Sequence, residues 1–191
     1  MTKLTRQTGS YWSDPRLGEI DARIATSGRG IHPTTVSELI SLVTTRLFEN
    51  GDLRALYAVE EVCFAPPVRF SRDLMRSLAH DPNCRTWLGI VDQVRAGFAI
   101  VGLSGEDDPT AAYIWTIEVL PTFRRMGVAR QLLARVEESA REAGCAAVEL
   151  HVSERNHDAQ ALYEGSGYFK FGVDTEFYGW GEDGLRYRKR L

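Results

Sequence analysis

Cysteine is scarce in this sequence, and its scarcity limits the chemistry that the chain can support. Only Cys63, Cys84 and Cys145 occur among 191 residues, far apart and odd in number. Disulfide frameworks and structural zinc sites use paired, closely spaced cysteines. The pattern therefore predicts no disulfide framework and no metal site, and it favours the reducing cytoplasm as the compartment.

Long apolar runs, repeats and an excess of positive charge are missing as well. No stretch is apolar for long enough to span a bilayer, and residues 1–30 lack the apolar centre of a signal peptide. There are no repeats and no low-complexity tracts. The formal net charge is -3, which is unsuited to general nucleic-acid binding. We therefore expect a protein with no membrane partner and no nucleic-acid partner.

What is present is the composition of an ordinary globular domain. The chain is 43% hydrophobic, and its length suits one domain plus an extension. Residues 1–35 contain scattered glycine, proline and charge with little periodicity, so we interpret them as a partly flexible N-terminal extension. Residues 36–191 then form the folded domain.

Hydrophobic periodicity predicts helices and strands in alternating groups along this domain. The expected order is strand, two helices, three strands, helix, strand, helix and two strands. The predicted ranges are 39–48, 53–64, 71–80, 86–91, 95–103, 111–120, 125–143, 147–152, 158–164, 168–173 and 185–191. Asp52 and Ser71 are the expected helix N-caps. This order favours a mixed α/β layer fold with helices packed on one sheet.

The most informative segment joins the strand that ends near Leu120 to the long helix that follows. It carries Arg124 and Arg125, and then Gly127. The first N–H groups of a helix lack intrahelical partners and attract anions. A glycine lets the backbone approach a ligand closely. The segment therefore predicts a phosphate site, although it has neither the lysine of a Walker loop nor the glycines of a dinucleotide fingerprint.

Two motifs in this order resemble those of the GNAT acetyltransferase superfamily. The segment from Arg124 to Ala129 resembles the Q/R-x-x-G-x-G/A signature, with Ala129 in place of the third glycine. The segment from Asn156 to Tyr168 resembles the N-x-x-A-x-x-L-Y-x-x-x-G-F/Y pattern. The likeness covers roughly residues 39–191. It is nearest to the ribosomal-protein alanine N-acetyltransferase-like branch, although Arg125 and Tyr187 depart from common family residues.

This resemblance implies the acyl-CoA N-acyltransferase fold, with a central mixed, mostly antiparallel, splayed sheet flanked by helices. It also implies acetyl-CoA as co-substrate and no metal. The backbone N–H of Val119 would face the thioester oxygen, where a preorganised donor contributes ~3–4 kcal/mol to the transition state. The residues that the resemblance assigns to cofactor binding are Ile117, Val119, Arg124, Arg125, Met126, Gly127, Val128, Ala129 and Asn156. Asn156 is equally well interpreted as a helix cap.

Two residues are the expected catalytic groups. An amine acceptor is protonated at neutral pH, and Glu118 is the first candidate for the base that removes its proton, directly or through water. His151 on the neighbouring strand is the rival base. Tyr163, in the second motif, is the candidate acid for the departing thiolate and would act by hydrogen bonding. Glu60, in the first helix, could attract an amine, although a solvated helix face is the simpler interpretation.

The predicted activity is transfer of an acetyl group to a primary amine, either a protein N-terminus or a small molecule, by direct attack in a ternary complex. A CoA-binding regulatory or interaction module of the same fold, without turnover, is the alternative. The sequence leaves open the acceptor, the acyl-chain length and whether the protein forms a homodimer.

Overall fold

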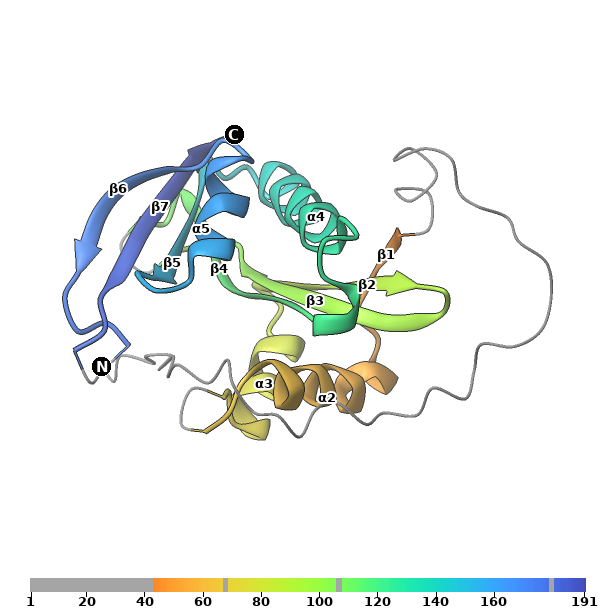
Figure 1. Ribbon diagram of the computed structural model, residues 1–191. Coiled ribbons are helices and arrows are strands. Elements are labelled where there is room, and N and C mark those ends of the chain that lie inside the picture. Colours follow the sequence, from red (N-terminus) through yellow and green to blue (C-terminus); the bar gives the residue numbers. More distant parts are fainter. Residues whose placement is uncertain (1–42, 67–68, 106–107, 179–180) are drawn as a thin grey trace, which may run out of the picture.

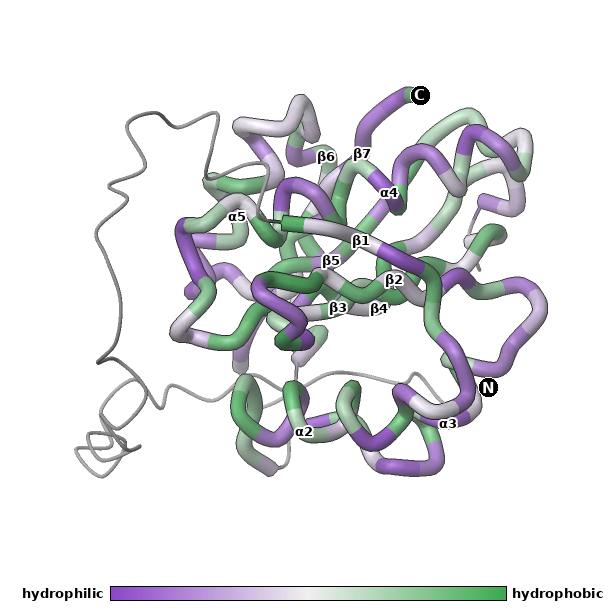
Figure 2. Tube along the Cα trace, turned by 90° about the vertical axis from the view of Figure 1, so that its right-hand side faces the viewer, coloured by the Kyte–Doolittle hydropathy of each residue, from purple (hydrophilic) through white to green (hydrophobic). Residues whose placement is uncertain are grey.

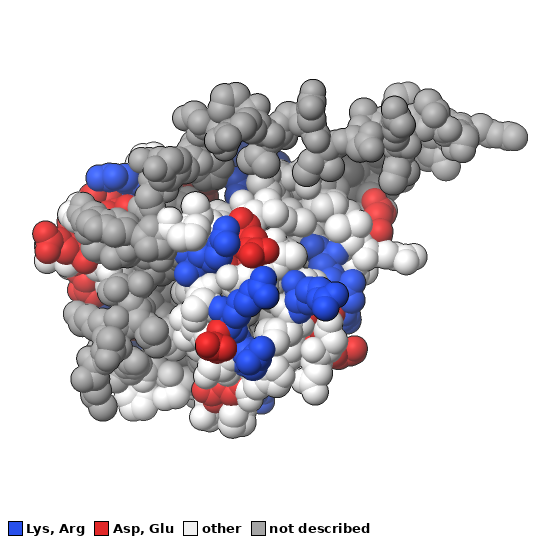
Figure 3. All heavy atoms as spheres, turned by 90° about the horizontal axis from the view of Figure 1, so that it is seen from below, with Lys and Arg blue, Asp and Glu red and all other residues white. Residues whose placement is uncertain are grey.

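The computed structural model describes residues 43–66, 69–105, 108–178 and 181–191. The predicted extension at residues 1–35 lies outside the described residues. In the described part, no helix has both the length and the apolar character needed to cross a bilayer. Acidic and basic side chains are interspersed over the described surface that is seen from below in Figure 3.

One seven-stranded sheet forms the centre of the molecule, in the order β1-β2-β3-β4-β5-β7-β6 (Figure 1). All neighbouring strands pair antiparallel except β4 and β5, which are parallel. The mixed, mostly antiparallel sheet predicted by the sequence is thereby confirmed. The strands are β1 Val43–Leu47, β2 Cys84–Val91, β3 Val94–Gly102, β4 Ala111–Val119, β5 Ala147–Ser153, β6 Phe169–Asp174 and β7 Gly184–Arg190.

Helices cover both faces of this sheet. Helix α4 packs on one face, and α2 and α3 pack on the other. Each layer encloses its own apolar core, and apolar residues follow the central strands between the helices (Figure 2). The predicted order of elements is confirmed. The helices are α2 Leu53–Cys63, α3 Arg72–His80, α4 Val128–Glu142 and α5 His157–Glu164, with short 3-10 turns η2 Asn50–Asp52 and η3 Pro121–Phe123.

Local backbone chemistry explains where several elements begin and end. Asp92 and Gln93 both have positive φ, 47° and 65°, as a type I′ hairpin turn requires. Ser71 caps α3 by accepting a hydrogen bond from the Leu74 N–H at 3.1 Å. The long helix begins at Val128 rather than at residue 125, so the predicted start was wrong. Positive φ at Arg125 (64°) and Gly127 (86°) makes this segment a turn instead of a right-handed helix.

Asp52 does not cap α2 with its side chain, contrary to the prediction. Its carboxylate is buried, with 2% of the residue exposed, and it accepts two hydrogen bonds from Arg46 at 2.6 and 2.8 Å. Arg95 of β3 donates to it at 3.0 Å, and so does the Glu49 N–H. These contacts tie the end of β1 to β3. The hydrogen bonds from Arg46 hold the pKa of Asp52 well below its usual range.

We expect Asp52→Asn to lower the free energy of unfolding by about 2–3 kcal/mol at pH 7, because it weakens hydrogen bonds to a charged group. Because the folded-state pKa of Asp52 is depressed, its contribution is present above the unfolded pKa of about 3.9 and is lost as the pH falls below it. Denaturant titrations at pH 7 and pH 3 check this. Asp73→Asn, in an exposed and loose pair with Arg76, is the control. An equal loss at both pH values would contradict the prediction.

Strands β4 and β5 part soon after they meet, and this divergence places the functional site. They pair only where Ala111–Tyr113 faces Ala147–Glu149. Trp115 is an extra residue in β4, because the register with β3 passes from Ile114 directly to Thr116. Such a bulge bends a strand and increases its local twist. β4 therefore continues beside β3 while β5 follows β7, which leaves an opening between them.

Candidate active site

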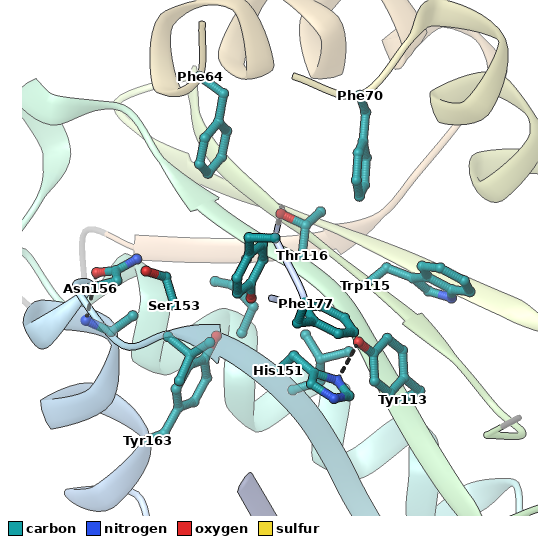
Figure 4. Close-up of a pocket in the computed structure, with 15 residues that line it drawn as sticks. Phe64, Phe70, Tyr113, Trp115, Thr116, His151, Ser153, Asn156, Tyr163 and Phe177 are labelled. Atoms are coloured by element: carbon teal, nitrogen blue, oxygen red, sulfur yellow. Dashed lines mark hydrogen bonds between the residues drawn. The ribbon is translucent and has the colours of Figure 1, made fainter. Parts of the chain in front are cut away.

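A pocket of about 100 Å³ occupies the opening between β4 and β5. Its walls come from β4, β5, α5 with its N-cap, and the α2–α3 and β6–β7 connections (Figure 4). Seven of the fifteen lining residues are aromatic: Phe64, Phe70, Tyr113, Trp115, Tyr163, Phe177 and Tyr178. Besides the tyrosines, the polar lining residues are Thr116, His151, Ser153 and Asn156. A small pocket with a mixed aromatic and polar lining suits a small reacting group rather than a large ligand.

The backbone of Val119 presents its N–H to the open side of β4. The N–H of the next residue, Leu120, donates to the carbonyl of Ala96 on β3 at 2.9 Å. Because successive N–H groups of an extended strand point to opposite edges, the Val119 N–H points away from β3. This is the orientation that the sequence interpretation requires of a donor to the thioester oxygen. Ile117, two residues earlier, lines the pocket.

The turn before α4 is shaped to approach an anion. Gly127 has a φ of 86°, and a Cβ built on it would meet nothing within 4 Å, so the surface above this glycine is open. The N–H groups of Val128, Ala129 and the next residue begin α4 and have no intrahelical acceptors. Arg125 is exposed beside them, and Met126 packs against the core. This arrangement fits a phosphate chain.

Arg124 takes a different position from its neighbour. Its Nε donates to the Val119 carbonyl at 3.2 Å, so the side chain turns back toward the end of β4. The thiol of Cys63, from the end of α2, donates to the same carbonyl at 3.5 Å. Burial, and then the nearby Glu118 carboxylate, raise the pKa of Cys63 to about 12. The thiol is therefore protonated at neutral pH and poorly suited to act as a nucleophile.

Glu118 lies behind the pocket rather than in its lining. It pairs in register with Phe98, whose ring belongs to the core under α2, and only 2% of Glu118 is exposed. Its Oε1 accepts a hydrogen bond from the Thr116 hydroxyl at 2.8 Å, and Thr116 does line the pocket. The carboxylate therefore reaches the reacting groups through Thr116.

His151 lies in the pocket and connects two other side chains in a line. Its Nδ1 is 2.9 Å from the Tyr113 hydroxyl and its Nε2 is 2.8 Å from Oδ2 of Asp174. Since a carboxylate only accepts, Nε2 carries the ring proton of the neutral histidine and Nδ1 accepts from the phenol. Phe177 stacks on the ring at 4.0 Å with an interplanar angle of 4°. These contacts fix the orientation of the imidazole within a small cavity with aromatic walls.

Tyr113 and Asp174 were not predicted from the sequence, although each left a partial signal. Tyr113 lies in the strand predicted at residues 111–120, and Asp174 directly follows the strand predicted at residues 168–173. The alternation of β5 placed His151 on the same face as Glu149, but nothing local indicated that β6 would bring Asp174 beside it. That contact depends on the strand order β5-β7-β6.

The second motif places its asparagine at the start of α5 and its tyrosine near the end of the same helix. Tyr163 is buried, lines the pocket and packs its ring against those of Tyr168 and Tyr187. Asn156 lines the pocket and also caps α5, accepting from the Ala159 N–H at 3.2 Å. The capping interpretation of Asn156 is therefore confirmed. Among the described residues, no group of three or more His, Cys, Asp or Glu could hold a metal ion.

Comparison with known proteins agrees with this geometry. Residues 40–168 match the acetyltransferase (GNAT) family. An acetyltransferase of Pectobacterium atrosepticum is 30% identical over 121 residues, covering 62% of this chain and 82% of that protein. An aminoglycoside N(6')-acetyltransferase type 1 of Salmonella typhimurium is 30% identical over 88 residues, covering 44% of this chain and 61% of that protein.

Solved structures show the same fold. The crystal structure of the ribosomal-protein-S18-alanine N-acetyltransferase from Escherichia coli superposes with a TM-score of 0.68 at 25% identity, covering 78% of this chain and 94% of that one. Among the curated relatives the matched share varies widely, since the chain spans only 28% of the length of an uncharacterized Mycobacterium leprae relative.

Proposed function

The chain belongs to the acetyltransferase (GNAT) family, and on this premise we propose that it transfers an acetyl group from acetyl-CoA to a primary amine. The observation that carries the proposal is the opening between β4 and β5, with the Val119 N–H directed into it and the Gly127 turn beyond its end. Both a protein N-terminus and a small-molecule amine remain in the acceptor class, because named relatives include an enzyme of each kind.

The chain's residues bind and orient the co-substrate at two places. Acetyl-CoA supplies the activated acetyl thioester when it is bound. We assign its phosphates to the N–H groups from Arg125 to Ala129, with Arg125 adding charge, and its thioester oxygen to the Val119 N–H. Arg124 supports this donor by holding the Val119 carbonyl. Ile117 and Asn156 would border the pantetheine chain of CoA, which joins its phosphates to the thioester.

The proton of the amine leaves through the chain of Tyr113, His151 and Asp174. The Tyr113 oxygen faces the pocket, so it accepts from the amine while its own proton passes to Nδ1 of His151. Asp174 fixes the ring orientation and stabilises the imidazolium, as the carboxylate does in other acid–base triads. His151 is therefore the base in this proposal. Glu118, behind Thr116, keeps a supporting role.

Transfer then makes the nitrogen–carbon bond and breaks the carbon–sulfur bond in one ternary complex. The raised pKa of Cys63 argues against an acyl-cysteine step. Tyr163 lines the pocket from the α5 side, and we assign to it a hydrogen bond to the departing sulfur as negative charge develops there.

The test is acceptor-dependent release of CoA thiol from acetyl-CoA, measured with alanyl peptides and small primary amines. We expect turnover by the wild type and a loss of at least ~tenfold in kcat for Tyr163→Phe, with the affinity for acetyl-CoA unchanged. Tyr168→Phe is the matched control, since its ring is also buried and touches that of Tyr163.

Two outcomes would contradict the proposal. CoA binding without acceptor-dependent release by the wild type would favour a regulatory module that binds CoA without turnover. Equal rates for Tyr163→Phe and the wild type would remove Tyr163 from the mechanism and leave the reaction class intact.

A further inference from the structure

Two aromatic walls face each other across the pocket, and neither belongs to the sheet. Phe64 and Phe70 stand on the α2–α3 connection, and Phe177 and Tyr178 stand on the β6–β7 connection. Figure 4 shows the two phenylalanines of the first wall on the far side of the pocket from Phe177. Connections between elements are generally the more mobile parts of a fold. Their separation therefore depends on what ties them to the sheet and helices.

A buried glutamate ties the first wall to α2. Glu60 is 0% exposed, so the solvated helix face expected from the sequence was wrong for this residue. Its Oε1 accepts a hydrogen bond from the Phe70 N–H at 2.8 Å. Nearby, Nε of Arg69 donates to the Phe64 carbonyl at 2.9 Å. The backbone of the wall is thus held to the helix.

A second buried glutamate ties the other wall to β5. Glu182 is 4% exposed, and its carboxylate accepts a hydrogen bond from the hydroxyl of Ser153, the last residue of β5. Its own carbonyl accepts from the Tyr178 N–H at 3.1 Å. Between these contacts, Phe177 lies flat on His151. Gly184 permits this packing, because a Cβ there would lie 2.7 Å from the Phe177 Cβ.

We propose that Glu60 and Glu182 are positioning residues that hold these two walls at a fixed separation and so restrict the acceptor to an amine beside a small, uncharged group. This inference rests on the proposed acetyl transfer. The N-terminal residue of a peptide with a short, neutral side chain is the chemical class that fits. Both glutamates act through wall residues rather than on the substrate.

The pocket lining supports the restriction on charge and size. Among the described residues that line the pocket there is no Asp, Glu, Lys or Arg. A charged side chain would lose its hydration there without gaining an ionic partner. The volume of about 100 Å³ is also well below the roughly 300–1,000 Å³ of pockets that enclose drug-sized ligands. A polycationic aminoglycoside fails on both counts.

The experiment measures kcat and KM for peptides that differ only in their first residue, Ala, Ser, Asp, Lys or Trp, and for kanamycin. We expect the wild type to prefer Ala and Ser by at least ~100-fold over the others, as buried, unpaired charge and excess volume are strongly disfavoured. Glu60→Ala and Glu182→Ala should raise KM for the alanyl peptide about tenfold, through loss of a charged hydrogen bond, and relax discrimination against Trp. Their kcat values and KM for acetyl-CoA should stay within about twofold.

Conservative and neighbouring variants separate positioning from general stability. Glu60→Gln and Glu182→Gln keep an acceptor oxygen, so we expect them to restore the wild-type preference. Asp73→Ala, at the start of α3, and Glu176→Ala, in the β6–β7 connection, remove exposed carboxylates near the two walls and are the controls. If the alanine variants do not fold, Gly184→Ala shifts Phe177 without removing either carboxylate, and it should relax the same discrimination.

The outcomes distinguish this inference from the proposed function. Turnover without discrimination among the acceptors, or equal effects of the glutamate variants on every acceptor and on acetyl-CoA, would overturn the positioning role while acetyl transfer stood. Efficient acetylation of kanamycin would overturn the acceptor class. No thiol release by the wild type with any acceptor would overturn both.

Discussion

Gly127→Asp should weaken the binding of CoA by at least ~100-fold while the protein remains folded. The glycine sits at a φ of 86°, which aspartate tolerates better than most residues, and its Cβ would meet nothing within 4 Å. A negative charge at a helix N-terminus also favours the helix itself. The same charge would stand where we assign the phosphates of CoA, so it would repel them and occupy the space above the turn.

A matched control exists at the other end of the same helix. Gly144 has a φ of 79°, and a Cβ there also meets nothing within 4 Å. Gly144→Asp therefore also places an aspartate at a positive φ, far from the proposed phosphate site at Gly127. Isothermal titration calorimetry with CoA and thermal unfolding should be measured for both variants. Unchanged affinity in Gly127→Asp, or an equal loss of affinity in both variants, would reject the assignment of the CoA phosphates to the turn before α4.

His151→Asn should lower kcat/KM by about 10²–10⁴-fold, the usual contribution of a positioned general base. Tyr113→Phe and Asp174→Asn interrupt the same chain and should each lose activity, with effects that do not add, because the three groups act as a unit. Glu118→Gln should cost much less, because Glu118 lies behind Thr116 and retains an oxygen that can accept the Thr116 hydroxyl.

The pH dependence decides between the two candidate bases. In the wild type, kcat/KM should fall on the acidic side as the base becomes protonated, and His151→Asn should remove that limb of the profile. Glu118→Gln is the control and should keep it. The opposite pattern, with the acidic limb lost in Glu118→Gln and kept in His151→Asn, would identify Glu118 as the general base. Thermal unfolding of each variant checks that the fold is retained.

Much of the candidate site is encoded in short stretches of sequence. Gly127 and the arginines before it indicated the turn to which we assign the phosphates of CoA, because helix termini and glycine have local properties that act over a few residues. The capping role of Asn156 and the hairpin at Asp92 and Gln93 are equally local, and both are confirmed. The start of α4 was misplaced by three residues, because the pattern of apolar residues does not report a positive φ.

The positions of the candidate catalytic groups are harder to predict, since they depend on which strands become neighbours. The sequence put Glu118 ahead of His151 as the base, and the fold places His151 in the pocket and Glu118 behind it. Asp174 is 23 positions from His151 and reaches it only through the order of the last three strands. Glu60 was interpreted as part of a solvated helix face because it is charged, yet packing of the α2–α3 connection buries it.

By itself, the sequence determined the order of helices and strands, the mixed sheet and the turn that begins α4, because periodicity, capping and glycine act within a few residues. Tertiary structure alone decided the opening between β4 and β5, which follows from the bulge at Trp115, and the meeting of Tyr113, His151 and Asp174. It also decided the burial of Glu60 and Glu182. These features join residues from separate elements, and only the packing of strands and connections fixes the distances between them.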